Sequence, residues 1–103
     1  MTKVSQYKLE PKLEKRLVGN LWDLLGGVGR KEAESFFSRF FTPTEILMFS
    51  KRLEILKRLV KEQSYSEIKT DLKVTNITVS RISNLLHRSR KTFLSVLARL
   101  SSN

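Results

Sequence analysis

The sequence predicts an all-α fold of six helices, and two features of its pattern indicate this. Apolar residues recur three and four positions apart along almost the whole chain, which is the spacing of a helix face. Strand signals are nearly absent, since there is no sustained alternation, no Asn-Gly or Asp-Gly turn, and only 2 prolines. At 103 residues, we expect a single domain over residues 1–103 with no separate catalytic module.

The N-terminal part, residues 8–62, is expected to form the core and a dimerisation surface from three helices. The first should end at Gly26-Gly27, because glycine is common at helix C-termini. Thr42 and Pro43 are typical of the N-cap and first position of a helix, and Glu45 completes a capping box. The predicted helices cover residues 10–25, 30–40 and 43–62.

The third predicted helix carries apolar residues on two adjoining flanks. A stripe this wide needs a partner on each side, so we expect the helix to contact both its own core and a second copy of the chain. A long central helix in a monomer is the alternative. The two flanks contain Ile46, Phe49, Leu53, Leu56 and Val60, and Leu47, Ile55 and Leu59.

Residues 64–87 have the dimensions of a helix-turn-helix. The two short helices, 64–72 and 76–87, are separated by a brief turn, and Ser64 with Glu67 suggests another capping box. A C-terminal helix is expected within residues 89–103. The positions facing the trihelical core are apolar, as required: Ile68, Leu72, Val74, Val79, Ile82 and Leu86.

The second of these helices presents small polar residues outward, as a DNA-reading helix does. Thr78 and Ser80 can bond phosphates or base edges, and Arg81 can donate two hydrogen bonds to guanine or hold a phosphate. Asn76 lies where helix N–H groups already favour phosphate. The outward set is Asn76, Ile77, Thr78, Ser80, Arg81 and Asn84.

Two residues break the usual rules of this motif. Lys73 stands in the turn where a glycine with positive φ is common, so strain is expected there. Lys69 stands where a small residue is usual, so its side chain must extend outward toward solvent or phosphate.

The charge of the chain favours a polyanionic partner. The formal net charge is +10. From Lys69 onward Asp71 is the lone acid, against seven basic residues: Lys69, Lys73, Arg81, Arg88, Arg90, Lys91 and Arg99. Double-stranded DNA is therefore the expected partner, and a merely solvated basic face is the alternative.

Other classes of function have little support. With no cysteine and no apolar run of about 18 residues, we expect neither a thiolate metal site nor a membrane span. We expect the protein to be cytoplasmic and to lie at the nucleoid. No enzyme activity, metal or cofactor is expected. His87 is the single histidine, Glu32 and Glu34 point to different helix faces, and the glycines near residue 27 lack a phosphate-loop pattern.

Over about Phe41 to Leu86 the sequence resembles the tryptophan-repressor superfamily, and within it the YerC/YecD-type proteins. The resemblance implies an intertwined homodimer with six helices per chain. The residues that carry it are Phe41 to Glu45, Arg52, Ile55, Leu59, Ser64, Glu67 to Lys69, Leu72, Thr78, Arg81, Ser83, Asn84 and Leu86.

The resemblance also assigns DNA-contact positions. Lys69, Thr78, Ser80 and Arg81 fall on such positions with matching residues. Three further positions differ in residue type: Asn76, Ile77 and Ser66, the last replacing an arginine.

Two arginines that sandwich the corepressor indole in that family match Arg52 and Arg81. The glycine that makes room for the ligand is replaced by Ile82, and a serine near the ligand is replaced by Leu85. Because Ile82 adds four heavy atoms where the indole would lie, we expect a vestigial pocket and no small-molecule corepressor.

Together these features predict a sequence-specific regulator of transcription that binds duplex DNA as a homodimer, places helix 76–87 in the major groove and acts as a repressor. The alternatives are a protein- or RNA-binding adaptor and a non-specific, nucleoid-type DNA binder.

Overall fold

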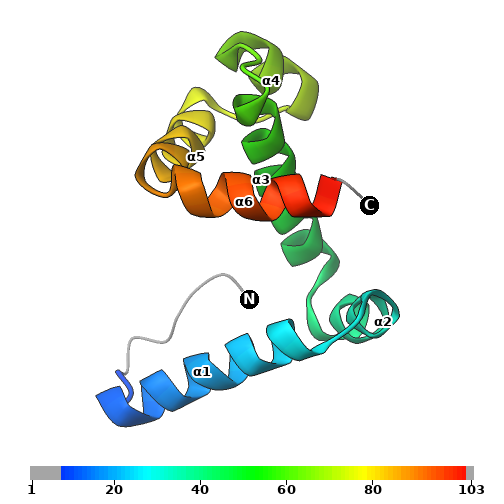
Figure 1. Cartoon of the computed structure of the whole chain (residues 1–103), viewed down its shortest axis with the longest axis vertical. Helices are drawn as coiled ribbons and strands as arrows, with labels where there is room; N and C mark the ends of the chain where they lie inside the picture. The colour runs from blue at the N-terminus through cyan, green and yellow to red at the C-terminus, as the bar shows by residue number, and fades with distance from the viewer. Residues whose placement is uncertain (1–7, 102–103) are drawn as a thin grey trace. The chain divides into compact units, whose positions relative to one another are not determined.

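The computed structural model describes residues 8–101, and these residues form six helices with no strand (Figure 1). The all-α prediction is confirmed. Over the described residues, no helix is long and apolar enough to cross a membrane. The helices are α1 (Pro11–Gly27), α2 (Arg30–Phe40), α3 (Pro43–Val60), α4 (Tyr65–Leu72), α5 (Asn76–Arg88) and α6 (Arg90–Ser101).

The chain divides into two compact units, and the division lies within α3, between Ile46 and Leu47. The first unit contains α1, α2 and the first turn of α3. The second contains the rest of α3 with α4, α5 and α6. The sequence led us to expect one domain whose helix-turn-helix starts at residue 64. That assignment stays a prediction. In the structure α3 from Leu47 onward groups with the helix-turn-helix, because Ile55 of α3 lies in the same core as Ile68.

In the first unit, neither α1 nor α2 contains a buried residue. Leu17, Leu21 and Leu25 recur four apart along α1 and therefore share one side of the helix, yet they are 37–47 % exposed. Trp22 is 63 % exposed. The apolar stripe of α1 is thus largely in contact with solvent in the single chain.

Four phenylalanines at the end of α2 pack against one another. The ring centroids of Phe37 and Phe41 are 5.2 Å apart and those of Phe36 and Phe40 are 5.3 Å apart, within the favourable range for aromatic pairs. Phe40 remains 60 % exposed. The rings cover part of each other but leave an apolar surface.

The helix α1 ends at Gly27, within the predicted Gly26-Gly27 stop and two residues beyond the predicted last helical residue, Leu25. Both glycines belong to the helix, which is followed by Val28 in an extended conformation with φ −99° and ψ 142°. No described glycine has a positive φ, so neither serves as a left-handed cap. Val28 is β-branched and favours extended backbone, which explains a stop one residue after the pair.

The predicted start of α3 is confirmed and its predicted end was two residues too long. The Thr42 N–H donates to the Glu45 carboxylate at 2.8 Å, and the Glu45 N–H donates to the Thr42 hydroxyl at 3.1 Å, which is a complete capping box. At the other end, Glu62 has φ 62° and the Gln63 N–H donates to the Arg58 carbonyl at 3.0 Å. This left-handed closing turn ends α3 at Val60.

The core lies in the second unit and is built from three helices. Ile55 of α3, Ile68 of α4 and Val79 of α5 are fully buried, and Ile82 is 5 % exposed. At about 1.5–3 kcal/mol for each fully buried aliphatic side chain, this cluster is the main source of stability in the unit. The half-buried residues packed around it are Leu56, Leu59, Leu72 and Val74.

Candidate DNA-binding site

The turn between α4 and α5 is held by Lys73 in a left-handed conformation, with φ 54° and ψ 52°. The strain predicted at Lys73 is therefore confirmed. The Val74 N–H donates to the Lys69 carbonyl at 3.2 Å, and the half-buried Val74 side chain packs on the core. A left-handed residue followed by such a bond is the usual close of a helix, normally made with glycine.

Thr75 is the N-cap of α5. Its hydroxyl accepts a hydrogen bond from the Thr78 N–H at 3.2 Å, and the two threonine hydroxyl oxygens are 3.1 Å apart. The cap satisfies one backbone donor at the start of the helix. Backbone and side-chain hydrogen bonds therefore fix the turn both at the end of α4 and at the start of α5.

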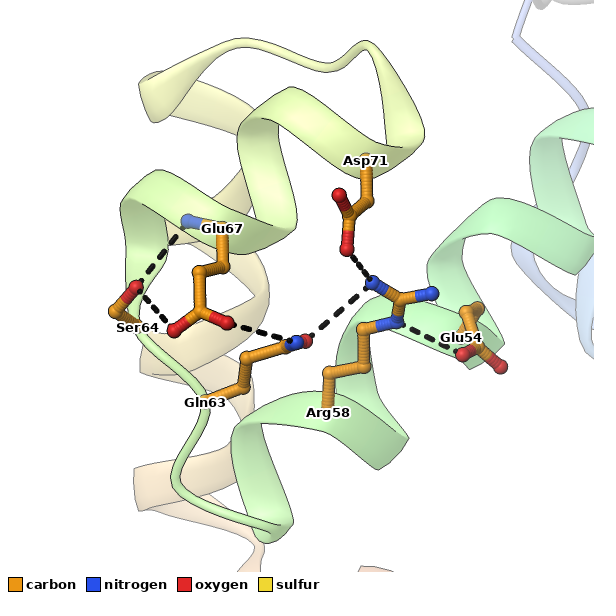
Figure 2. Close-up of polar contacts among 6 residues, drawn as sticks. All are labelled: Glu54, Arg58, Gln63, Ser64, Glu67 and Asp71. Atoms are coloured by element: carbon orange, nitrogen blue, oxygen red, sulfur yellow. Dashed lines mark hydrogen bonds and ion pairs between the residues drawn. The ribbon is translucent and has the colours of Figure 1, made fainter.

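Arg58 connects α3 to α4 (Figure 2). Its Nη1 atom donates to Asp71 Oδ2 at 2.7 Å and to Gln63 Oε1 at 3.4 Å, and its Nε atom donates to Glu54 Oε2 at 2.9 Å. The Gln63 amide donates in turn to a carboxylate oxygen of Glu67 at 3.5 Å. These contacts fix the position of α4, the first helix of the motif, against the end of α3.

Ser64 begins α4 with half of the predicted capping box (Figure 2). Its hydroxyl accepts from the Glu67 N–H at 3.2 Å and lies 3.1 Å from the Glu67 carboxylate. In a full box, the Glu67 side chain would accept from the Ser64 backbone N–H. Here the Glu67 carboxylate instead accepts hydrogen bonds from the Ser64 hydroxyl and the Gln63 side-chain amide.

The Arg58 cluster also affects the charge near the motif. Its two carboxylate partners, Glu54 first and then Asp71, raise the pKa of the Arg58 guanidinium above its usual value. Asp71 is the lone acid after Lys69 in the sequence. Since Asp71 is paired with Arg58, its charge is compensated within the cluster.

The residues predicted to contact DNA lie on α4 and α5. Thr78 and Ser80 are half-buried, and Ile77 is 64 % exposed. Lys69 extends to solvent from α4, as expected for a long side chain at that position. The exposed members of the set are Ser66, Lys69, Asn76, Ile77, Arg81 and Asn84.

The four residues assigned to a vestigial corepressor pocket line one cleft of about 500 Å³. Arg52 comes from α3, while Arg81, Ile82 and Leu85 come from α5. Ile82 also belongs to the buried core. The remaining lining residues are Thr78, Asn84 and Arg88, all from α5.

The family model described as Trp repressor protein matches residues 21–101. The chain belongs to the Trp repressor protein family. This is a family of helical DNA-binding regulators rather than of enzymes. No curated protein and no solved structure matches the chain.

The Trp repressor family match extends the resemblance in both directions. The sequence motifs covered about Phe41 to Leu86, whereas the match begins at Leu21 and therefore includes part of α1 and all of α2. The N-terminal helices are thus part of the family domain, although their residues alone indicated only helical character.

Two residues of the turn and cleft described above were missed by the sequence reasoning. Thr75 was read as part of the turn, although a threonine three residues before Thr78 is a typical N-cap signal. Arg88 was counted only as a basic residue. Its spacing of seven from Arg81, which is close to two helical turns, was the available sign that both face the same cleft.

Proposed function

We propose that this member of the Trp repressor family is a sequence-specific regulator of transcription that binds duplex DNA by inserting α5 into the major groove. The observation that carries the proposal is the row of exposed residues on α5, presented by a helix whose turn, cap and core contacts are all made. A rigid helix with exposed Asn, Ile and Arg side chains fits groove reading.

Within this proposal the residues divide into two groups. Arg81 and Asn84 read base edges, and the exposed Ile77 contacts a thymine methyl group. Ser66, Lys69 and Asn76 contact phosphate, with Thr78 and Ser80 at the margin of the interface because their side chains are half-buried.

In vitro selection of bound duplexes, followed by fluorescence anisotropy, tests the proposal. We expect enrichment of a (pseudo)palindromic site, because a dimer reads two half-sites. The selected duplex should bind at least about 10³-fold more tightly than a scrambled duplex at the same salt concentration. Equal affinity for every duplex would indicate nucleoid-type binding. Tighter binding to RNA or single-stranded DNA would favour the adaptor alternative.

We also propose that the functional form is a homodimer and that it represses transcription by occupying its site. The exposed apolar side chains of α1, together with Leu53 of α3 at 48 % exposure, support a second copy as their cover. Leu53→Glu should halve the sedimenting mass, whereas Lys57→Glu, at an exposed position of the same helix, should not. An unchanged mass for Leu53→Glu would contradict the interface.

If the protein is a repressor, deletion of its gene should raise the transcript levels of the genes next to its binding sites. A fall in those transcripts would identify an activator. Transcript measurement with and without the chain distinguishes the two outcomes, and an Arg81→Ala variant should change the transcripts in the same direction as the deletion.

We further propose that DNA binding does not require tryptophan. Ile82 occupies both the core and the cleft wall, so the indole would have to displace a side chain that is 5 % exposed. Calorimetry with L-tryptophan should give no heat of binding at micromolar concentrations. Measurable micromolar binding by the unmodified chain would overturn this part of the proposal and leave DNA recognition standing.

A further inference from the structure

Three guanidinium groups line the open cleft beside α5. They belong to Arg52 of α3 and to Arg81 and Arg88 of α5. Within residues 8–101, none of these three arginines has an ion-pair partner, in contrast to Arg58. The cleft is therefore a concentration of positive charge that the described part of the chain leaves uncompensated.

The rest of the lining adds hydrogen-bond donors and no carboxylate. Thr78 and Asn84 contribute a hydroxyl and an amide, and the apolar base is formed by Ile82 and Leu85. Arg81 and Arg88 are seven residues apart, so they project from the same side of α5. That side also carries Asn84, which is exposed.

Like charges that share one cleft repel each other, and an anion between them relieves the repulsion. The planar guanidinium group matches the oxygens of a phosphate, to which it can donate two parallel hydrogen bonds. A threonine hydroxyl and an asparagine amide are common additional donors to phosphate. The lining thus has the chemistry of a phosphate site.

We propose that this cleft binds a backbone phosphate of the DNA, with Arg52 and Arg88 as its phosphate-binding residues. The proposal rests on the proposed function and adds to it two residues outside the predicted contact set. A polymer backbone is the favoured source of the phosphate, because the cleft is open and adjoins the exposed Arg81 and Asn84 of the reading helix.

Anisotropy titrations of the full chain with selected and scrambled duplexes, across a range of salt concentrations, test this assignment. Arg52→Ala and Arg88→Ala should each weaken both duplexes by the same factor. Each should also reduce the slope of log K against log salt by about 0.9, the value for one released phosphate contact. Arg88→Lys should retain most of the slope, because the charge is kept.

Lys57→Ala is the matched control, since it removes one positive charge from an exposed position of α3 outside the cleft. Lys57 follows Arg52 by five residues and so points from a different side of the helix. Its salt slope should equal that of the unmodified chain. The assignment is overturned if the arginine variants keep the full slope, or if Lys57→Ala lowers it equally. Should Arg52→Ala fail to fold by circular dichroism, the comparison of Arg88→Ala with Arg88→Lys decides.

Calorimetry with inorganic phosphate at constant ionic strength examines the other source of this chemistry. Micromolar binding of phosphate that competes with DNA would assign the cleft to a free anion and overturn the DNA assignment. We expect no such binding. If the unmodified chain binds no duplex even at low salt, the proposed function itself fails; if it binds and the variants behave as wild type, only the cleft assignment fails.

Discussion

The backbone conformation of Lys73 is energetically unfavourable for a residue with a Cβ atom. A non-glycine residue in the left-handed region is disfavoured by contact between Cβ and the backbone, and Lys73 has φ 54°. The position nevertheless forms the turn that separates the two helices of the motif. Lysine is retained there despite a backbone geometry that suits glycine.

Lys73→Gly should raise the free energy of unfolding by about 0.5–1 kcal/mol, since relief of the left-handed strain exceeds the added freedom of the unfolded chain. Urea denaturation measures the change. Lys73→Ala, which removes the charge but keeps Cβ, serves as the control and should not be stabilising. Equal stabilisation by both variants would assign the effect to charge.

Arg81 is the residue whose role decides specificity. If it reads guanine, Arg81→Ala should cost roughly 1–3 kcal/mol of binding and relax the preference at one base pair. Selection of bound duplexes with the variant measures that preference. An equal loss on every duplex would instead assign Arg81 to the phosphate backbone, together with Arg52 and Arg88.

For single residues, the sequence predicted features that follow from local backbone geometry. It did not predict contacts between side chains on different helices. Lys73 and Lys69 were identifiable because each violates a local rule of the motif. The Arg58–Asp71 contact joins residues thirteen apart on different helices, so no spacing within one helix announces it.

At the scale of helices, the termini show which local signals are reliable. Thr42 and Glu45 identified the start of α3 because both bonds of a capping box are local. Glycine pairs are weaker signals, since glycine permits a left-handed cap without requiring one. That is why Gly26 and Gly27 remain helical. The close of α3 at Glu62, a residue that rarely takes positive φ, carried no such signal.

The contact between α3 and α4 depends on Arg58. Arg58→Ala should lower the melting temperature more than Asp71→Asn, because the arginine bonds to Glu54 and Gln63 as well as to Asp71. Thermal unfolding followed by circular dichroism checks the order. Lys57→Ala is again the control, as an exposed cation without these contacts. The reverse order would mean that Asp71, rather than Arg58, is central to the cluster.

At the scale of the whole chain, burial is uneven. The buried residues of the described chain all lie in the second unit, from Ile55 to Leu86, whereas α1 and α2 contribute none. The sequence pattern indicated that α1 has an apolar stripe. What covers that stripe could not be predicted, because periodicity identifies a face but not its partner.

Trp22 offers a direct probe of this partner. It is the single tryptophan and is 63 % exposed in one chain. If a second copy covers α1, its fluorescence should shift to longer wavelength as the protein is diluted below the dimer Kd. The midpoint of that shift should agree with sedimentation equilibrium. An emission maximum that does not change with concentration would argue against a dimer interface at α1.

The absence of buried residues in α1 and α2 bears on how steeply occupancy of the DNA site depends on the concentration of the protein. If two copies must pair before a site is occupied, then below the dimer Kd the dimer concentration rises with the square of the chain concentration. A doubling of synthesis would raise occupancy of a weakly filled operator roughly four-fold. The uncovered stripe on α1 would thereby convert a graded change in protein level into a steep transcriptional response.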